Sequence, residues 1–423
     1  MSALGVLLRR LRPSSLGAAI GRRRAKIARG LRGVDQRVLE LRPLTAPRGT
    51  VLFSHVLDPL LEPLDPWRPV VHSLHWEVRR MAETLVELGF IVDAVSWTNR
   101  RFAPRRDYDL VLDVRTNLER WATVLGEHAV KVLHCDTAHF AFHNRAQHER
   151  LRRLERRRGI RLAPHRLLPE NRAIELADHA TVLGNAFTLE TWAAAAPPHT
   201  EIVRVPVSCP WTYPWPADKD FAAASRRWIW IGSDGFVHKG LDLVLEAFAK
   251  LSGFELFVCG PLWREPAFER AFYRELHRTP NIHTLGWVDP ASSRFAELAR
   301  RAIGVVFPSS SEGGGVSALV GLHAGLVPLV TRESSIDLAP GLAPYLGDAE
   351  PEEIRERVHE LSALPAADVA AQARLAWEDV RARHTREHFA RRWREVAEAM
   401  LESRLAGSAA PGAGSADGTN DRV

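Results

Sequence analysis

Short apolar runs alternate along the chain with longer stretches whose apolar residues recur at helical spacing. In the first half the apolar runs lie at 51–54, 91–95, 109–114, 129–135 and 177–183. Between the first two runs, Met81, Leu85 and Leu88 would share one face of a helix that begins near Ser73. Strands that alternate with helices predict parallel βαβ units and a doubly wound sheet.

The same alternation returns in the second half of the chain. Apolar strands are predicted at 227–232, 254–259, 281–285, 303–307 and 329–331, with helices at 241–251, 295–300 and 316–324. A stretch rich in Pro and Trp, residues 206–224, interrupts the pattern and marks a domain boundary. The sequence therefore predicts an α/β protein with two Rossmann-like parallel-sheet domains, whose ligands bind at the C-terminal ends of the strands.

These boundaries predict a domain organisation for the whole chain. We expect a basic N-terminal extension (1–48), an N-terminal Rossmann-like domain (49–214), a C-terminal Rossmann-like domain (215–385), a final helix (386–405) and a disordered tail (406–423). The final helix carries an apolar stripe of Phe389, Trp393, Val396 and Met400. The extension has two interpretations: a poorly ordered segment, or a short amphipathic helix that lies on an anionic membrane.

Charge, cysteine content and the length of the apolar runs limit which ligands and which cellular locations are expected. The net charge of +6 comes almost wholly from Arg, which suits phosphorylated ligands, an anionic membrane or an Arg-rich proteome. Cys135, Cys209 and Cys259 form no CxxC pair, which argues against a disulfide framework. No apolar run is long enough to span a bilayer, and the N-terminus does not read as a signal peptide. We expect a cytoplasmic protein, with peripheral contact at the inner membrane face as the alternative. Basic runs without interleaved aromatic residues predict no nucleic-acid partner.

Candidate chemistry concentrates in residues 305–330, which read as strand, glycine-rich turn, helix and strand. The turn and the helix start consist of Glu312, Gly313, Gly314, Gly315, Val316 and Ser317. Glycines let a backbone approach a ligand closely, and the start of a helix favours an anion such as a phosphate. A carboxylate beside phosphate donors can accept hydrogen bonds from ligand hydroxyls. This combination predicts a site for a nucleotide-sugar.

A second candidate follows the first strand of the C-terminal domain. The turn there contains Gly232 and Ser233, and its end, GFVHKG, places Lys239 between the strand and the next helix. The Lys239 ammonium group is able to neutralise a diphosphate at that edge of the sheet. The alternative interpretation is an ordinary surface lysine.

The loop after the strand at 129–135 is rich in histidine. His139 and His143 are four residues apart and would share one face of a helix, which is also a spacing of metal ligands. A catalytic or substrate-contacting histidine and a structural histidine are the other interpretations. No HExxH pattern is present and no cysteine supports the pair, so we predict no metal site. The following run, residues 150–161, reads as a solvated charged helix face.

Several of these segments together carry a resemblance to a known family. In order and spacing, IGSDGFVHKGLDLVLEAF, LFVCG, NIHTLGWV and VVFPSSSEGGGVSALVGLHAGLVPLVT resemble the nucleotide-sugar-binding half of a GT-B glycosyltransferase of the glycogen-synthase-like family 4. HWEVRRMAETLVELGFIVDAV resembles, more loosely, the family's first helix and second strand. The resemblance implies two domains around an interdomain cleft, with the final helix crossing back onto the N-terminal domain.

The resemblance also implies roles for individual residues. Lys239 matches the lysine that contacts the donor diphosphate, and Glu312 matches the first acid of a paired-glutamate motif that holds the donor sugar hydroxyls. His139 is the best match to an N-domain histidine that contacts the donor sugar, and His143 is the second. The implied catalytic residues are therefore His139 and Glu312. The implied substrate-binding residues are Gly232, Ser233, Lys239, Gly313, Gly314, Gly315, Val316, Ser317 and His143.

Two positions depart from the family pattern. The second glutamate, which grips the nucleotide ribose in that family, is replaced by Val320. The family's arginine in the first turn is also missing, and Ser233 and Asp234 stand there. Both losses weaken donor binding as the family achieves it. An unusual nucleotide, compensation by another residue, or a lost activity would each fit.

The expected activity is transfer of a sugar from a nucleotide-diphosphate sugar to an acceptor, which would be a glycan, a lipid-linked glycan or a small molecule. The resemblance implies retention of anomeric configuration and no cofactor or metal beyond the donor substrate. Two alternatives stay open. One is a nucleotide-sugar epimerase of GT-B shape, which would consume no acceptor. The other is a catalytically inactive GT-B scaffold, which would bind no nucleotide-sugar.

Overall fold

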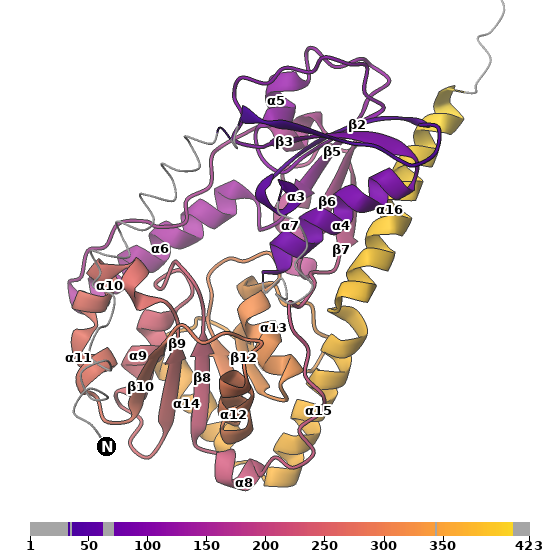
Figure 1. Ribbon diagram of the computed structural model, residues 1–423. Helices are drawn as coiled ribbons and strands as arrows, with labels where there is room; N and C mark the ends of the chain where they lie inside the picture. Colours follow the sequence, from indigo (N-terminus) through magenta and orange to yellow (C-terminus); the bar gives the residue numbers. More distant parts are fainter. Residues whose placement is uncertain (1–32, 34–35, 62–71, 343–344, 409–423) are drawn as a thin grey trace, which may run out of the picture.

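Two open sheets, one above the other, form the framework of the protein (Figure 1). The computed structural model describes residues 33, 36–61, 72–342 and 345–408. The upper, N-terminal domain contains β1 (Val38–Leu41), β2 (Gly49–His55), α3 (Asp58–Leu61), α4 (Ser73–Glu87), β3 (Phe90–Ser96), β4 (Leu110–Asp113), α5 (Asn117–Trp121), β5 (Val130–Cys135), α6 (Phe140–Arg158), η2 (Ala173–Leu176), β6 (His179–Leu183), α7 (Ala186–Ala193) and β7 (Glu201–Val205).

The lower domain begins after the Pro- and Trp-rich stretch. It contains α8 (Phe221–Ala224), β8 (Arg227–Ile231), α9 (Leu241–Phe248), β9 (Glu255–Cys259), η3 (Leu262–Arg264), α10 (Pro266–Ala271), α11 (Tyr273–Arg278), β10 (Ile282–Gly286), α12 (Ser293–Arg301), β11 (Gly304–Phe307), α13 (Val316–His323), β12 (Val327–Thr331), η4 (Arg332–Ser334), β13 (Tyr345–Leu346), α14 (Pro351–Ala363) and α15 (Ala366–Arg383). The last helix, α16 (Arg386–Ser408), follows these elements.

Both sheets follow the doubly wound pattern that the sequence predicts. The first has the order β1-β3-β2-β4-β5-β6-β7, and its strands are parallel except for β1, which runs antiparallel to β3. The second has the order β10-β9-β8-β11-β12-β13 and is parallel throughout. In the second sheet the strand order reverses between β8 and β11. Ligands of doubly wound sheets bind at such a switch point, beyond the carboxyl ends of the strands.

The N-terminal boundary predicted from the sequence is wrong in one respect. Residues 1–48 were expected to form an extension, but β1 lies within this range and pairs with β3, with Val38 opposite Val95 and Leu41 opposite Val92. The first domain therefore begins before residue 49. The segment for which a poorly ordered extension or a short membrane-binding helix was predicted lies largely outside the described residues, as does the tail from residue 409. Within the described ranges, no helix has the length and apolar character needed to cross a membrane.

The last helices connect the two domains. Ala376 and Val380 of α15 are buried in the core of the lower domain. The stripe of α16, Phe389, Trp393, Val396 and Met400, is buried in the core of the upper domain. The Trp393 indole Nε1 donates to the backbone O of Met81 in α4 at 3.3 Å. In Figure 1 this yellow pair of helices runs along one side of the molecule, from the lower sheet to the upper one.

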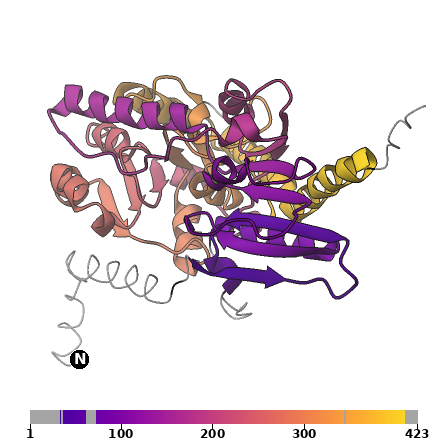
Figure 2. The same cartoon turned by 90° about the horizontal axis from the view of Figure 1, so that it is seen from above.

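Helix α6 also belongs to both domains. It follows β5 of the upper sheet, yet it extends over the lower domain (Figure 2). Leu154 is fully buried in the lower core, and Arg157 Nη2 pairs with Oδ2 of the buried Asp242 at 2.8 Å. Arg150 is also buried and donates to the backbone O of Pro308 at 2.8 Å. The interpretation of residues 150–161 as a solvated face was therefore wrong, because part of this face packs against the second domain.

Candidate functional site

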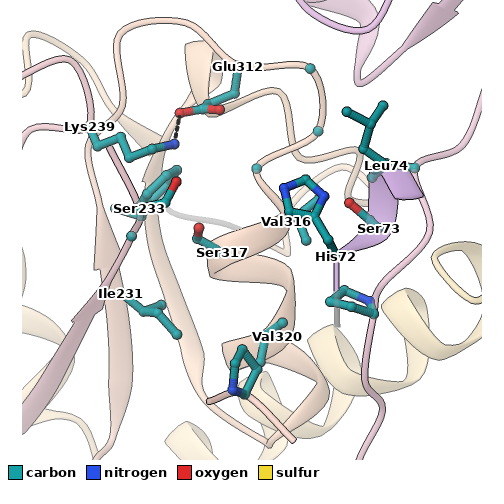
Figure 3. A pocket seen from close by; sticks show the side chains of 18 of the residues that line it. His72, Ser73, Leu74, Ile231, Ser233, Lys239, Glu312, Val316, Ser317 and Val320 are labelled. Atoms are coloured by element: carbon teal, nitrogen blue, oxygen red, sulfur yellow. Dashed lines mark hydrogen bonds and ion pairs between the residues drawn. The ribbon is translucent and has the colours of Figure 1, made fainter. Parts of the chain in front are cut away.

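A cavity of about 280 Å³ lies between the two domains. Its lower side is formed where β8 and β11 end, so the cavity lies at the switch point of the second sheet. Residues of the lower domain in its lining include Gly232, Ser233, Lys239, Glu312, Gly313, Gly314, Gly315, Val316, Ser317 and Val320. Residues of the upper domain in its lining include His72, Ser73, Leu74, Glu77, Asp136 and Arg166. We call this space the cleft cavity. Figure 3 shows His72, Ser73 and Leu74 across from the start of α13.

A buried ion pair joins the two strongest candidates from the sequence. The Lys239 Nζ donates to Glu312 Oε1, and the Lys239 and Glu312 side chains are only 4% and 11% exposed (Figure 3). Lys239 precedes α9, and Glu312 follows β11 on the other side of the switch point. Two residues far apart in the sequence thus meet because their strands are neighbours in the sheet.

The surroundings set the charge of both partners. Burial lowers the pKa of Lys239 to about 8, while the attraction of Glu312 opposes that shift. Burial alone would raise the pKa of Glu312, but Lys239, Arg166 and His238 together hold it far below its usual range. The Ser309 hydroxyl also donates to Glu312 Oε1 at 3.0 Å. Glu312 is therefore a carboxylate at neutral pH, and Lys239 is mostly an ammonium ion.

Each glycine of the turn touches protein at close range. A Cβ on Gly313 would lie 1.9 Å from the backbone O of Asp136 in the upper domain. A Cβ on Gly314 would lie 2.6 Å from Val207 Cγ1, and one on Gly315 would lie 2.5 Å from Ile336 Cγ1. Gly315 also has φ +55, which favours glycine. The sequence predicted glycines that admit a ligand. They line the cleft cavity, but their small size also admits neighbouring protein segments.

The first residues of α13, Val316 and Ser317, line the cleft cavity. Gly315 is the N-cap, and the first helical hydrogen bond in this turn runs from Ala318 N to Gly315 O at 2.8 Å. The N–H groups of Val316 and Ser317 precede it, so they have no intrahelical acceptor. One turn further on, Val320 lines the cavity while it is buried in the core of the lower domain.

His143 lies on the far side of Glu312 rather than in the cleft cavity. It lines a side cavity of about 250 Å³ that shares Asp136, Arg166, Glu312 and Gly313 with the cleft cavity. His143 Nε2 lies 2.7 Å from the backbone O of Arg166, so this nitrogen carries the proton and donates. His143 Nδ1 then accepts from the Ser311 hydroxyl at 2.9 Å. With both nitrogens engaged and its pKa lowered to about 4 by burial, His143 is a neutral histidine that connects the two domains.

His139 is placed elsewhere. It is the N-cap of α6, where its Nδ1 accepts from Ala141 N at 3.4 Å, and its ring packs edge-on against Trp192 at 4.9 Å. It does not line the cleft cavity. The prediction that His139 and His143 share a helical face is wrong, because α6 begins only at Phe140. Among the residues that the structure describes, no group of three or more His, Cys, Asp or Glu side chains could hold a metal ion.

The lining includes several residues that the sequence patterns did not single out, and Arg166 and Glu77 are two of them. Arg166, in the loop after α6, lines the cleft cavity and places its Nη2 at 3.9 Å from Glu312 Oε2. Glu77, in the second turn of α4, is buried and accepts from Ser208 N at 2.7 Å and from Ser208 Oγ at 2.8 Å. Burial raises the pKa of Glu77 to about 7. Glu77 lies in a helix that the sequence predicts, but a single carboxylate there matches no functional motif. Arg166 lies in an irregular loop, where no periodic pattern indicates its position.

Comparisons with known proteins agree with this architecture. A family profile described as Glycosyl transferases group 1 matches residues 225–363, which include Lys239 and Glu312. No curated protein matches the chain in sequence. Among solved structures, an α,α-trehalose-phosphate synthase (UDP-forming) from Burkholderia vietnamiensis is 12% identical and has a TM-score of 0.56, covering 87% of this chain and 99% of its own.

Other solved structures extend the comparison. Anabaena Alr3699/HepE in complex with UDP-glucose is 12% identical, with a TM-score of 0.54 and coverage of 83% of this chain and 100% of its own. A trehalose-6-phosphate synthase studied for glycosyl transfer with retention is 8% identical, with a TM-score of 0.51 and coverage of 84% and 99%. The chain spans about half the length of two TarM structures, 55% and 54% of them. The similarities to the two trehalose-phosphate synthases and to Alr3699/HepE confirm the predicted GT-B fold.

Proposed function

We propose that the protein transfers a sugar from a nucleoside-diphosphate sugar to an acceptor hydroxyl in the cleft cavity. The observation that carries the proposal is the buried Lys239–Glu312 pair at the start of α13, at the switch point of the second sheet. A buried ammonium group and helix N–H groups suit a diphosphate, and a buried carboxylate suits sugar hydroxyls. The cleft therefore places cationic and N–H groups for the diphosphate next to a carboxylate for the sugar hydroxyls, and these two parts of a nucleotide-sugar are adjacent.

The chemistry follows from where charge develops. When the bond between the anomeric carbon and the diphosphate breaks, negative charge grows on the leaving phosphate oxygen. Lys239 and the N–H groups of Val316 and Ser317 are fixed beside that position before the reaction begins. Stabilisation by such preorganised groups in a site with little water is a major source of catalysis.

Donor binding would also rearrange the ion pair. Glu312 Oε1 accepts hydrogen bonds from Lys239 Nζ and from the Ser309 hydroxyl. A diphosphate offers Lys239 a second anionic partner, and Glu312 then becomes free to accept from the donor sugar. The cost of separating the pair is offset by the charge-assisted hydrogen bonds that each partner gains.

The acceptor would enter from the upper domain, past His72, Ser73, Leu74 and Glu77. A glycan or lipid-linked glycan is our expectation for it, since these side chains offer hydroxyl, imidazole and carboxyl groups to a polyol. Transfer with retention is proposed from the trehalose-6-phosphate synthase of similar fold. UDP is a natural first donor nucleotide to test, because Alr3699/HepE binds UDP-glucose. We also propose that the protein belongs to family 4 and that it transfers a hexosyl group. We further propose that it acts in the cytoplasm and needs no cofactor.

The test replaces each member of the pair without changing its size greatly. Lys239→Met and Glu312→Gln should each lower the transfer rate more than about tenfold, a loss of at least about 1.4 kcal/mol of transition-state stabilisation. Each single variant leaves the other partner as an unpaired buried charge, which can destabilise the fold by itself. The double variant Lys239→Met/Glu312→Gln removes both charges, so it separates a loss of activity from a loss of folding. Lys219→Met is the matched control. Lys219 is also buried, but its Nζ donates to the backbone O of Gly325, and the residue does not line the cleft cavity.

Three readouts are needed on the wild-type protein: nucleotide-sugar binding, release of nucleoside diphosphate, and analysis of the sugar product. Wild-type rates in both single variants would refute the site assignment. An epimer formed from the donor alone, without nucleotide release, would replace transfer by epimerisation. No binding to any nucleotide-sugar would favour a scaffold.

A further inference from the structure

Arg166 is held in place by two side chains of α6. Its backbone O accepts from His143 Nε2 at 2.7 Å, and its backbone N donates to Gln147 Oε1 at 3.1 Å. His143 and Gln147 are one helical turn apart and are both buried. His143 is anchored in turn to the Ser311 hydroxyl, next to Glu312. The irregular loop is thus fixed to α6 at Arg166, and two further hydrogen bonds between Asn144 and the backbone of Leu168 hold it two residues later.

The Arg166 side chain crosses from the upper domain to the lower one. Its Cδ and Cγ pass over Gly235, where a Cβ would lie 2.4 Å and 3.0 Å from them. The turn that contains Gly235 is held by Glu265, whose Oε1 accepts from the N–H groups of Gly235 and Phe236. Absence of a side chain at residue 235 therefore opens the path along which the arginine reaches the cavity.

The guanidinium group has loose contacts at the end of this path. Its Nη1 lies 3.5 Å from Asp234 O, and its Nη2 lies 3.9 Å from Glu312 Oε2. Two neighbouring arginines are engaged more tightly: Arg264 lies 2.9 Å from Asp234 Oδ1, and Arg115 lies 2.5 Å from Asp136 Oδ1. Arg166 lines the cleft cavity, the side cavity and a third cavity next to Ser233 and Trp263. Arg166 therefore brings to the cleft lining a guanidinium group whose N–H donors can bind a ligand.

Charge balance shows what this group can bind. Lys239 is already neutralised by Glu312, so the pair alone adds no net positive charge to the cleft. A nucleoside diphosphate carries negative charge on both phosphates, and a second cation is needed beside Lys239. A planar guanidinium group is well suited to phosphate oxygens, which it can bind through two hydrogen bonds.

We infer that Arg166 of the upper domain binds the donor diphosphate together with Lys239 of the lower domain. His143 is the positioning residue that fixes Arg166 relative to Glu312. The inference rests on the proposed function, because it names a further residue of the same donor site. It means that the diphosphate site is complete only when both domains are in place.

The experiment measures binding of UDP, GDP, ADP, CDP and dTDP by titration calorimetry, with the matching nucleosides in parallel. For whichever diphosphate the wild-type protein binds, Arg166→Ala should weaken affinity about tenfold or more, as loss of a charge-assisted hydrogen bond predicts. Nucleoside binding should not change. Arg152→Ala, a surface change on α6 with the same loss of charge, is the control and should have no effect.

Two further variants separate binding from structure. Ser233→Arg in the Arg166→Ala background should restore part of the diphosphate affinity, since Ser233 lines the same cavities. His143→Phe should weaken binding as Arg166→Ala does, and the double variant should lose no more than either single one, because both act through one contact. His143→Gln, which can still donate to Arg166 O, should retain most of the affinity.

The outcomes are distinguishable. If the wild-type protein binds a diphosphate and Arg166→Ala binds it equally well, the inference fails and the proposed function stands. If affinity for the nucleoside falls as much as affinity for the diphosphate, the arginine acts on the shape of the cleft and the inference also fails. If the wild-type protein binds no nucleoside diphosphate, both the proposed function and this inference are overturned.

Discussion

Lys239 is a cation whose charge depends on pH within the range of ordinary assays. Burial lowers its pKa to about 8, so the free protein loses the ammonium charge as the pH rises through that value. We expect kcat/KM for transfer to be constant below this pH and to fall above it, because the free enzyme then lacks the cation that meets the diphosphate.

A pH–rate profile of Lys239→Arg checks this expectation. Arg stays protonated throughout the range, so the fall near pH 8 should disappear even if the absolute rate is lower. Lys219→Met should keep the fall, because Lys219 lies outside the cleft lining. A profile of Lys239→Arg that still falls near pH 8 would assign the titration to another group.

Glu77 gives a prediction about stability. Its pKa is raised from 4.5 to about 7 by burial, so the folded protein retains a proton that the unfolded chain releases between these values. Stability contributed by this group is therefore present at low pH and is lost as the pH rises through 7. Glu77→Gln removes the titration and should raise the free energy of unfolding above pH 7 by up to about 3 kcal/mol.

Denaturant titrations at pH 5 and pH 8 test the Glu77 prediction. The difference in unfolding free energy between wild type and Glu77→Gln should grow from the lower to the higher pH. Glu83→Gln, a change at a more exposed position of the same helix, should show no such growth. Parallel curves for wild type and Glu77→Gln would show that Glu77 is ionised in the folded protein at both pH values.

Local chemistry explains which site residues could be predicted. Lys239 and Glu312 each follow a predicted strand, and parallel strands bring their C-terminal ends to one edge, so their meeting could be inferred. Arg166 could not be, because its place depends on hydrogen bonds to residues 19 and 23 positions earlier. His139 was predicted on a helix, but the sequence did not reveal that the helix starts one residue later.

At the scale of elements, α6 shows how packing departs from sequence pattern. Its sequence is dominated by Arg, yet Leu154 is fully buried in the core of the lower domain. Leu154→Ala should lower the free energy of unfolding by about 2–5 kcal/mol, because it leaves a cavity in that core. Leu375→Ala, at an exposed position of α15, should cost far less. Equal losses in the two variants, measured by denaturant unfolding, would contradict the shared role of α6.

The strands that the sequence missed have physical features in common. β1 has four residues, and Arg42 and Pro43 follow it. β13 has only two residues, and both β1 and β13 are edge strands. β7, also at an edge, has five residues, two of them charged, and only Val205 is buried. The central strands were predictable because burial on both faces requires continuous apolar runs.

At the scale of the whole molecule, Gly313 controls how closely the domains approach. A Cβ there would lie 1.9 Å from the backbone O of Asp136, and neither atom can move away unless its backbone segment moves too. Gly313→Ala should therefore widen the cleft, increase the radius of gyration in small-angle X-ray scattering and lower donor affinity about tenfold or more, which is a loss of about 1.4 kcal/mol.

Gly347→Ala is the control for this change. Its Cβ would make an ordinary contact of 3.5 Å with Glu353, outside the cleft. An unchanged scattering profile and unchanged affinity in Gly313→Ala would mean that the two domains approach each other independently of this contact.

The reach of Arg166 across the cleft has a consequence for protein engineering. Chimeric enzymes are often assembled by exchanging one domain of a two-domain scaffold, on the assumption that donor recognition travels with it. A graft of residues 215–385 from this chain would carry Lys239 and Glu312 into a new host, and it would leave behind Arg166 and the histidine that fixes it. A transplant intended to preserve the donor would have to include the segment from His143 to Arg166 as well.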